Sequence, residues 1–329
     1  MRTICFVLML NAAFADYGGG YAGAGFRYGS NAREFALAGA LIADKTPGFY
    51  PFSNPALLQF SKSNHIGLSI NSMSLDRSIQ SFSFSRRLPP SAGVGVAILR
   101  AGTDNIQGRN FENQITETFS VYDLEGIISF GVALGSKLAF GLNIKIIYPN
   151  LAPEIMDKYS GNQDGTALSG DLGVIYKFHR RLIFGGLIQN LGGSYNWKLT
   201  NPWEDKERNY LEELPQIISI GAAYSKIKGV ILFFQEDIVS TPGNDVNYRT
   251  RIAGEFHLRN DIKLRAGLKQ ARGTAPTGVQ ADGLNIKPSF GVGVPIKVWQ
   301  RQYIHLDYAL DLGSVGEGLS HLFSFSLEF

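Results

Sequence analysis

Two carboxylate–imidazole pairs are the residues of this sequence best suited to acid–base chemistry. Glu255 lies two positions before His257, and His305 lies two positions before Asp307. Side chains at positions i and i+2 of a β-strand share a face, so each pair could supply the hydrogen-bonded acid and base of a hydrolase. No nucleophile is marked beside either pair, and a polar surface lined with ion pairs explains them more simply. We therefore predict that the chain has no catalytic residues and is not an enzyme.

Two further patterns could hold a cofactor or a metal ion. Residues 18–23 (GGGYAG) match a dinucleotide-binding loop by letter, but that loop needs a strand before it and a helix after it. None of the histidines has the spacing of a metal site such as HExxH. We expect neither a cofactor nor a metal ion. The histidines are His65, His179, His257, His305 and His321.

The composition excludes several classes of protein. Only 18% of the 329 residues are charged, against about 25% in soluble domains. The chain is rich in glycine (38) and aromatic residues (22 Phe, 14 Tyr and 3 Trp), and its net charge of +3 gives no basic face for nucleic acid. Past the first residues, no apolar window reaches the length of a transmembrane helix, about 20 residues.

Residues 1–15 have the pattern of a secretory signal peptide. Arg2 supplies the positive end, residues 4–10 form an apolar run, and Ala13-Phe14-Ala15 matches a cleavage site. We expect the mature chain to begin at Asp16. Cys5 is the only cysteine and would leave with the signal peptide, so disulfides cannot stabilise the exported protein.

The elements that position the remaining residues are predicted to be strands, because apolar and polar residues alternate with period two from about residue 64 onward. Between residues 138 and 148, for example, Phe140 and Leu142 face one way, whereas Asn143 and Lys145 face the other. Only Ile147 breaks this alternation. The pattern gives about fourteen segments: 64–72, 78–87, 92–100, 118–134, 137–148, 166–178, 182–191, 216–225, 229–238, 247–258, 261–270, 284–294, 302–311 and 319–329.

The connections between these segments alternate between tight and long, with long ones at 101–117, 149–165 and 192–215. A soluble β-sandwich has no reason to sort its loops in this way, whereas an outer-membrane barrel has short periplasmic turns and long external loops. An even number of segments of bilayer-spanning length supports the same conclusion. We predict an all-β fold, a transmembrane antiparallel β-barrel of about 14 strands in the outer membrane of a Gram-negative (diderm) bacterium.

Charged residues share one face of the later strands, opposite an apolar face that would contact lipid. A basic side chain on the lipid side costs about 2–4 kcal/mol at mid-depth, so we expect these charges to line the lumen. The predicted cluster is Arg249, Arg251, Glu255, His257, Lys263, Arg265, His305 and Asp307.

Two other regions are candidates for function. Residues 16–63 lack the period-two pattern and are predicted to fold as a plug inside a barrel formed by residues 64–329, with a short helix within 33–43. The loop at 192–215 combines aromatic and charged residues, which suits either recognition or an interfacial aromatic girdle. Trp197, Trp203 and Tyr210 are its recognition candidates.

Several motifs in the plug and barrel resemble those of the PorV/PorQ proteins within the FadL-like outer-membrane barrels. The plug carries Asn31-Ala32-Arg33, Ala38-Gly39-Ala40 and Asn54-Pro55-Ala56-Leu57. Later similarities are Asp171-Leu172-Gly173 and Gln189-Asn190-Leu191-Gly192. The resemblance implies a 14-stranded barrel with an N-terminal plug, whose motif residues are Arg33, Gly39, Asn54, Pro55 and Ala56.

The same resemblance implies two functions. PorV-type proteins act in type IX secretion, where they bind exported client proteins and translocon subunits. FadL-type proteins pass long-chain fatty acids or other hydrophobic small molecules through the barrel wall. The charged later strands favour protein handling over an apolar pocket. We therefore predict a secretion component with outer-membrane lipid, translocon subunits and client proteins as partners, and keep the hydrophobic channel as the alternative.

Overall fold

The computed structural model describes residues 22–46, 48–61, 63–151, 163–201, 206–240, 246–271, 285–298, 302–312 and 319–329. The predicted signal peptide and Trp203 lie outside these residues. Within them, no helix is long and apolar enough to cross a bilayer.

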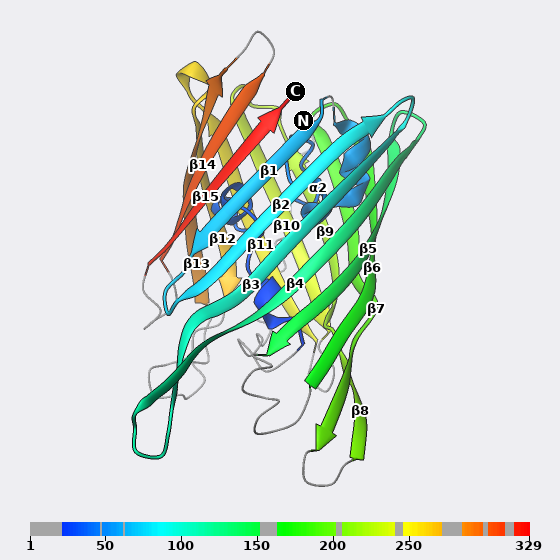
Figure 1. Ribbon diagram of the computed structural model, residues 1–329. Coiled ribbons are helices and arrows are strands. Elements are labelled where there is room, and N and C mark those ends of the chain that lie inside the picture. Colours follow the sequence, from blue (N-terminus) through cyan, green and yellow to red (C-terminus); the bar gives the residue numbers. More distant parts are fainter. Residues whose placement is uncertain are drawn as a thin grey trace.

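Nearly all of the regular structure consists of antiparallel strands (Figure 1). The strands are β1 (His65–Ser72), β2 (Arg77–Leu88), β3 (Ala92–Arg109), β4 (Ile115–Leu134), β5 (Leu138–Leu151), β6 (Gln163–His179), β7 (Leu182–Asn201), β8 (Lys206–Glu213), β9 (Gln216–Tyr224), β10 (Val230–Ser240), β11 (Asn247–His257), β12 (Lys263–Ala271), β13 (Asn285–Lys297), β14 (Tyr303–Asp311) and β15 (Ser320–Glu328). The short helices are η1 (Ala24–Arg27), α1 (Ala32–Ala36), α2 (Tyr50–Ser53), η2 (Pro55–Phe60) and η3 (Arg259–Asp261).

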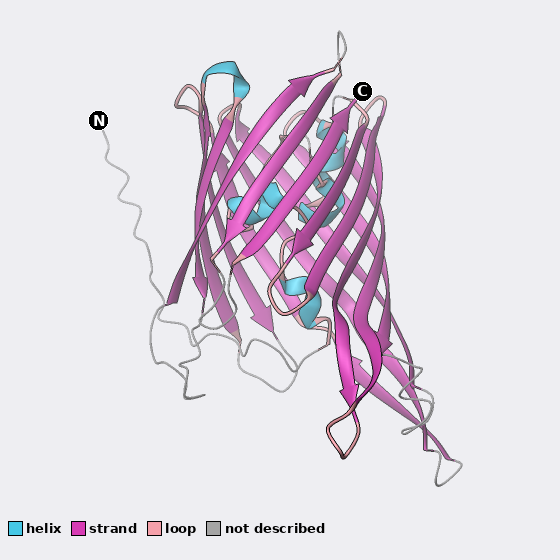
Figure 2. Ribbon diagram, turned by 60° about the vertical axis from the view of Figure 1, so that its left-hand side comes forward, coloured by secondary structure: helices cyan, strands magenta, loops and turns pink. Residues whose placement is uncertain are grey.

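The sheet closes on itself. β1 pairs with β15, with His65 opposite Glu328, and every other strand of the wall pairs with its neighbours in the chain order. β8 and β9 share one position in the wall. β9 pairs with residues 182–189 of β7, and β8 pairs with residues 194–201 of the same strand. The wall therefore has 14 strands and one extra strand, which confirms the predicted transmembrane barrel (Figure 2).

Two predicted loops are wrong in part. β3 and β4 continue through most of residues 101–117 and turn at residues 110–114, and β7 and β8 extend through much of residues 192–215. Both hairpins project beyond the barrel at its lower end in Figure 1. Their backbone groups pair with each other, so the strands can continue where the lipid-facing pattern has ended.

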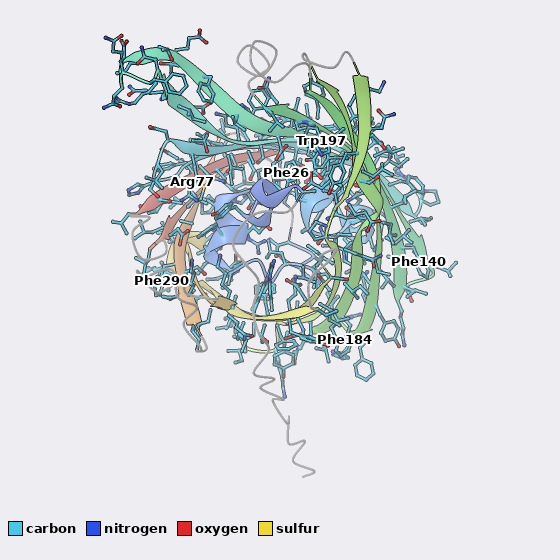
Figure 3. All side chains as sticks on the ribbon, turned by 90° about the horizontal axis from the view of Figure 1, so that it is seen from below. Phe26, Arg77, Phe140, Phe184, Trp197 and Phe290 are labelled. Atoms are coloured by element: carbon cyan, nitrogen blue, oxygen red, sulfur yellow. The ribbon has the colours of Figure 1, made fainter. Side chains whose placement is uncertain are left out.

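The side-chain faces of the wall follow the alternation in the sequence. On β5, Ile146 is 59% exposed on the outside, whereas Lys145 is buried on the inside. Ile147, the residue that breaks the alternation, is 1% exposed and packs in an apolar cluster within the barrel. Phe140, Phe184 and Phe290 point outward in Figure 3, which looks along the barrel. An apolar belt around a closed antiparallel wall is the surface of an outer-membrane barrel.

Residues 22–61, here called the plug, lie inside this wall. Buried plug residues such as Leu41, Ile42 and Leu57 form one core with wall residues such as Ile175 and Phe233. α1 is shorter than the predicted helix and ends at Ala36, because Ala38 and Gly39 take positive φ angles of 53° and 79°. The chain turns there and continues through extended and short helical segments.

Inward-facing glycines of the wall let the plug backbone come close. A Cβ added to Gly141 would lie 2.1 Å from the backbone nitrogen of Ala56, and one added to Gly93 would lie 2.4 Å from the carbonyl oxygen of Leu58. Gly131 and Gly185 are similarly close to plug carbonyl groups. The absence of side chains at these positions allows the prolyl turn of the plug to sit directly against the wall.

We predict that Gly141→Ala loosens the plug. The new methyl group would meet backbone atoms, which cannot rotate away, so the free energy of unfolding should fall by about 1–3 kcal/mol, as for other overpacked cores. Urea unfolding in lipid vesicles, followed by tryptophan fluorescence, measures the change. Gly126→Ala is the control, because its nearest added contact is 3.9 Å away. Equal unfolding midpoints for the two variants would contradict this role of Gly141.

Candidate functional site

A buried ion-pair network joins the plug to the charged strands. Arg33 of α1 donates from Nε to Glu255 Oε2 (3.0 Å) and also pairs with Asp44 of the plug. Arg265 donates to the same Glu255 oxygen (2.7 Å) and to Asp307 (2.5 Å). Glu255 is 0% exposed. A buried carboxylate needs paired charges, and here two guanidinium groups from different parts of the chain supply them.

The structure brings only part of the predicted charged cluster together. His257 Nε2 lies 2.9 Å from Glu255 Oε1, and Lys263 is directly opposite His257 in the β11–β12 ladder. His305 does not bond to Asp307 but lies 3.3 Å from Glu328. The acid–base pair considered for residues 305 and 307 therefore does not form, and both residues take part in ion pairs with other partners.

Two arginines of β11 lie farther toward the long-loop end. Arg251 pairs with Asp237 (2.7 Å) and donates to the carbonyl oxygen of Gly39 (3.1 Å). A Cβ on Gly39 would lie 2.2 Å from the Arg251 guanidinium, and φ at Gly39 is positive, so glycine suits this position on both counts. Arg249 lines the internal cavity described below.

Asn54, Pro55 and Ala56 form a tight, buried turn against the inner face of the wall. The Asn54 amide nitrogen donates to the carbonyl oxygen of Ile42 (3.0 Å), and its Oδ1 accepts from the backbone nitrogen of Ala56 (3.0 Å). Asn54 thereby caps η2, which begins at Pro55, and ties two plug segments together.

A second charged network lies in the wall of β4 to β7. Lys145 Nζ lies 3.0 Å from Asp171 and 3.4 Å from Glu125, and donates to Asn190 Oδ1 (2.7 Å). The alternation on β5 predicts that Lys145 faces away from the apolar side chains, but it does not identify the partners of Lys145. Lys145, Glu125 and Asp171 all face inward on neighbouring strands. The alternation of side chains along each strand therefore indicates that the three residues share the inner face.

An internal cavity of about 170 Å³ lies between the plug and this part of the wall. Much of its lining is apolar, including Phe26, Leu99, Ile127, Leu187 and Ile217. Charged and amide groups of the Lys145 network border it on one side, and Glu34, Gln235, Arg249 and Arg251 border it elsewhere. The lining thus combines apolar and polar side chains in about equal measure.

The barrel wall is irregular where the cavity meets it. The β6–β7 ladder shifts register around Gly170, and Asn190 and Gly192 of β7 have φ angles of 61° and 64°. On the other side of β7, the strand position is interrupted at Leu214 and Pro215, between β8 and β9. Asn190 Nδ2 spans this break by donating to the carbonyl oxygen of Pro215 (2.8 Å).

The cavity is bounded by η1 on its long-loop side. Phe26 of η1 packs on apolar clusters from both sides of the barrel, one around Leu99 and one around Tyr195. Figure 3 shows Phe26 and Trp197 within the ring of strands.

The recognition candidates are placed differently from one another. Trp197 is packed against the inner cluster, stacks on Tyr195 with ring centroids 5.3 Å apart, and donates to Glu212 (2.9 Å). Tyr210 on β8 is 59% exposed. Trp197 is therefore part of the packing around the cavity and does not present its ring on an outer surface.

Two plug side chains have altered acidity. Burial raises the pKa of Glu34, although hydrogen bonds from Ser30 act in the opposite direction. Burial also raises the pKa of Tyr50, with a further contribution from the Asp44 charge, so its hydroxyl stays protonated and donates to the carbonyl oxygen of Lys45 (2.8 Å). Among the residues that the structure describes, no group of three His, Cys, Asp or Glu side chains could hold a metal ion.

Comparison with known proteins gives structural matches only. No protein-family model matches the chain, and no curated protein is similar to it in sequence. The toluene transporter TodX of Pseudomonas putida matches with a TM-score of 0.60 at 15% identity, over 92% of this chain and 98% of TodX. The Ralstonia pickettii toluene transporter TbuX matches with a TM-score of 0.59 at 13% identity, over 92% and 98% of the two chains.

A FadL homologue of Pseudomonas aeruginosa matches with a TM-score of 0.60 at 11% identity, over 91% of this chain and 98% of that chain. The fold is that of the FadL-type barrels.

We predict that Glu255→Gln releases the plug anchor. The change leaves Arg33 and Arg265 buried without their shared carboxylate, and breaking a buried pair costs about 3–5 kcal/mol. The free energy of unfolding in urea should fall accordingly, and protease should cleave the plug at a lower concentration. Glu213→Gln, at an exposed position, should change the free energy of unfolding by less than about 0.5 kcal/mol. Identical protease resistance of the two variants would show that Glu255 does not hold the plug.

Proposed function

We propose that this protein is an outer-membrane channel that admits small hydrophobic molecules. The observation that carries the proposal is the position of the internal cavity, which is lined in part by apolar side chains and borders a discontinuous part of the barrel wall. The residues at the discontinuity, including Asn190, Leu214 and Pro215, themselves line the cavity. A hydrophobic solute that enters the cavity therefore lies next to a part of the wall where the backbone ladder is interrupted.

The size of the cavity favours a small solute. An engineered protein cavity of about 150 Å³ holds benzene, and the cavity here is of similar volume. A volume of this size is of the order that a molecule with one aromatic ring needs. A long-chain fatty acid would need more room than the described residues leave.

The matched structures support the same proposal. TodX and TbuX are toluene transporters, and CymD, a further match with a TM-score of 0.60, is a monoaromatic hydrocarbon channel. Transport of a hydrophobic small molecule was the alternative in the sequence analysis, and the comparisons favour it over type IX secretion.

The charged strands give less support to protein handling than their sequence suggests. Their charges were expected to leave the lumen polar, but Glu255, Arg265 and Asp307 are engaged with one another and with Arg33 of the plug. These side chains hold an internal segment in place and do not form a surface for a client protein. The interpretation as a secretion component thus rests on the sequence motifs alone.

We predict that Ile217→Trp reduces uptake of toluene. Ile217 faces the cavity, and the indole ring of a tryptophan there would occupy the space that a toluene molecule needs. Uptake should therefore fall roughly fivefold or more. The assay compares accumulation of radiolabelled toluene by cells that express the full chain and by cells that lack it.

Ile218→Trp is the matched control, because the neighbouring side chain is 40% exposed on the lipid face. Heat-dependent migration on gels verifies that both variants are folded. Loss of uptake in both variants alike, or uptake no greater than in cells without the protein, would refute the channel. Recovery of secretion components in a detergent pull-down, with no uptake, would favour the secretion interpretation.

A further inference from the structure

The end of the barrel that carries the short turns is strongly basic. Nine exposed lysine and arginine side chains lie in or beside six turns, and we call them the basic rim. They are Arg86, Arg87, Lys137, Arg180, Arg181, Lys226, Lys228, Arg259 and Lys297. All six turns join antiparallel neighbours at the same end of the barrel (Figure 1), so the charges follow the wall from the β2–β3 turn to the β13–β14 turn.

The connections at the opposite end have the opposite balance. The three longest ones, residues 101–117, 149–165 and 192–215, contain eleven acidic and five basic residues. The net charge of the chain is only +3, so the two ends are polarised and the excess of positive charge is local to the short turns. Within the described residues, none of the nine rim side chains forms an ion pair.

The basic rim is continuous with the apolar belt of the barrel. Apolar side chains that are at least half exposed lie in the same turns or next to them: Leu134, Phe178, Ile227, Leu258 and Val298. Long basic side chains beside such residues keep their stems on the apolar surface and extend their charged groups to the level of the lipid headgroups. Short turns lie on the periplasmic side of outer-membrane barrels, so these headgroups belong to the inner leaflet.

We propose that the basic rim binds the phosphate headgroups of anionic phospholipids in the periplasmic leaflet. Basic residues at a membrane surface attract anionic lipids, and arginine adds paired hydrogen bonds to phosphate oxygens. The arrangement fits lipid better than a soluble acidic protein, because the charges follow the barrel wall beside lipid-facing residues.

The test measures which lipids surround the full chain in a bilayer. The protein is reconstituted in phosphatidylcholine, and spin-labelled phosphatidylglycerol or phosphatidylcholine is added as the probe. We expect the association constant of the anionic probe to exceed that of the neutral one by roughly threefold in low salt. The preference should fall toward unity in about 1 M salt, because the Debye length shortens to about 3 Å.

Matched double variants distinguish the rim from general charge. Arg180→Gln with Arg181→Gln should lower the preference, whereas Arg109→Gln with Lys198→Gln removes two exposed charges from the other end and should leave it unchanged. Equal association of the two probes with the unmodified protein, or an equal effect of both variants, would overturn the proposal. Salt-sensitive binding of polyglutamate without any lipid preference would also overturn it, and would indicate an acidic protein partner.

Discussion

Closure of the backbone hydrogen-bond network is the constraint on which this structure depends. Hydrocarbon offers no partner for an unpaired amide or carbonyl group, so a β-sheet can lie in lipid only when its first and last strands pair. The β1–β15 ladder meets that requirement over the whole length of β1, from the His65–Glu328 pair to the Ser72–His321 pair. A closed wall of 14 strands also encloses more space than its own side chains fill, and the plug occupies that space.

The plug is held by contacts that only the inside of such a wall permits. Its prolyl turn needs inward positions without side chains, which Gly93, Gly131 and Gly141 supply. Its Arg33 is buried away from water and needs an opposite charge, which the buried carboxylate of Glu255 supplies. Steric fit holds one part of the plug, and an ion pair holds another. The cavity is space that the plug leaves unfilled, and residues of β4 to β7 form part of its lining.

The sequence predicted the wall well because the two faces of each strand meet different solvents. Lipid requires apolar residues and the lumen tolerates polar ones, so strands such as β5 and β11 carry a clear period of two. That contrast is absent where β3, β4, β7 and β8 leave the bilayer and both faces meet water, and the extended hairpins were missed there. The break at Leu214 and Pro215 could not be predicted either, because it depends on how two strands share one edge of β7.

The site shows the same limit at the level of single residues. Alternation indicates the face on which Glu255, Arg265 or Lys145 lies, but not the register that decides which partner each one meets. Arg33 and Glu255 are separated by 222 positions in the chain, and only the folded plug brings them within 3.0 Å. Counting inward charges therefore overestimated the polarity of the lumen. A charge that is paired within the barrel is no longer available to a client, and the internal space left for binding is the cavity beside the irregular wall, whose lining is partly apolar.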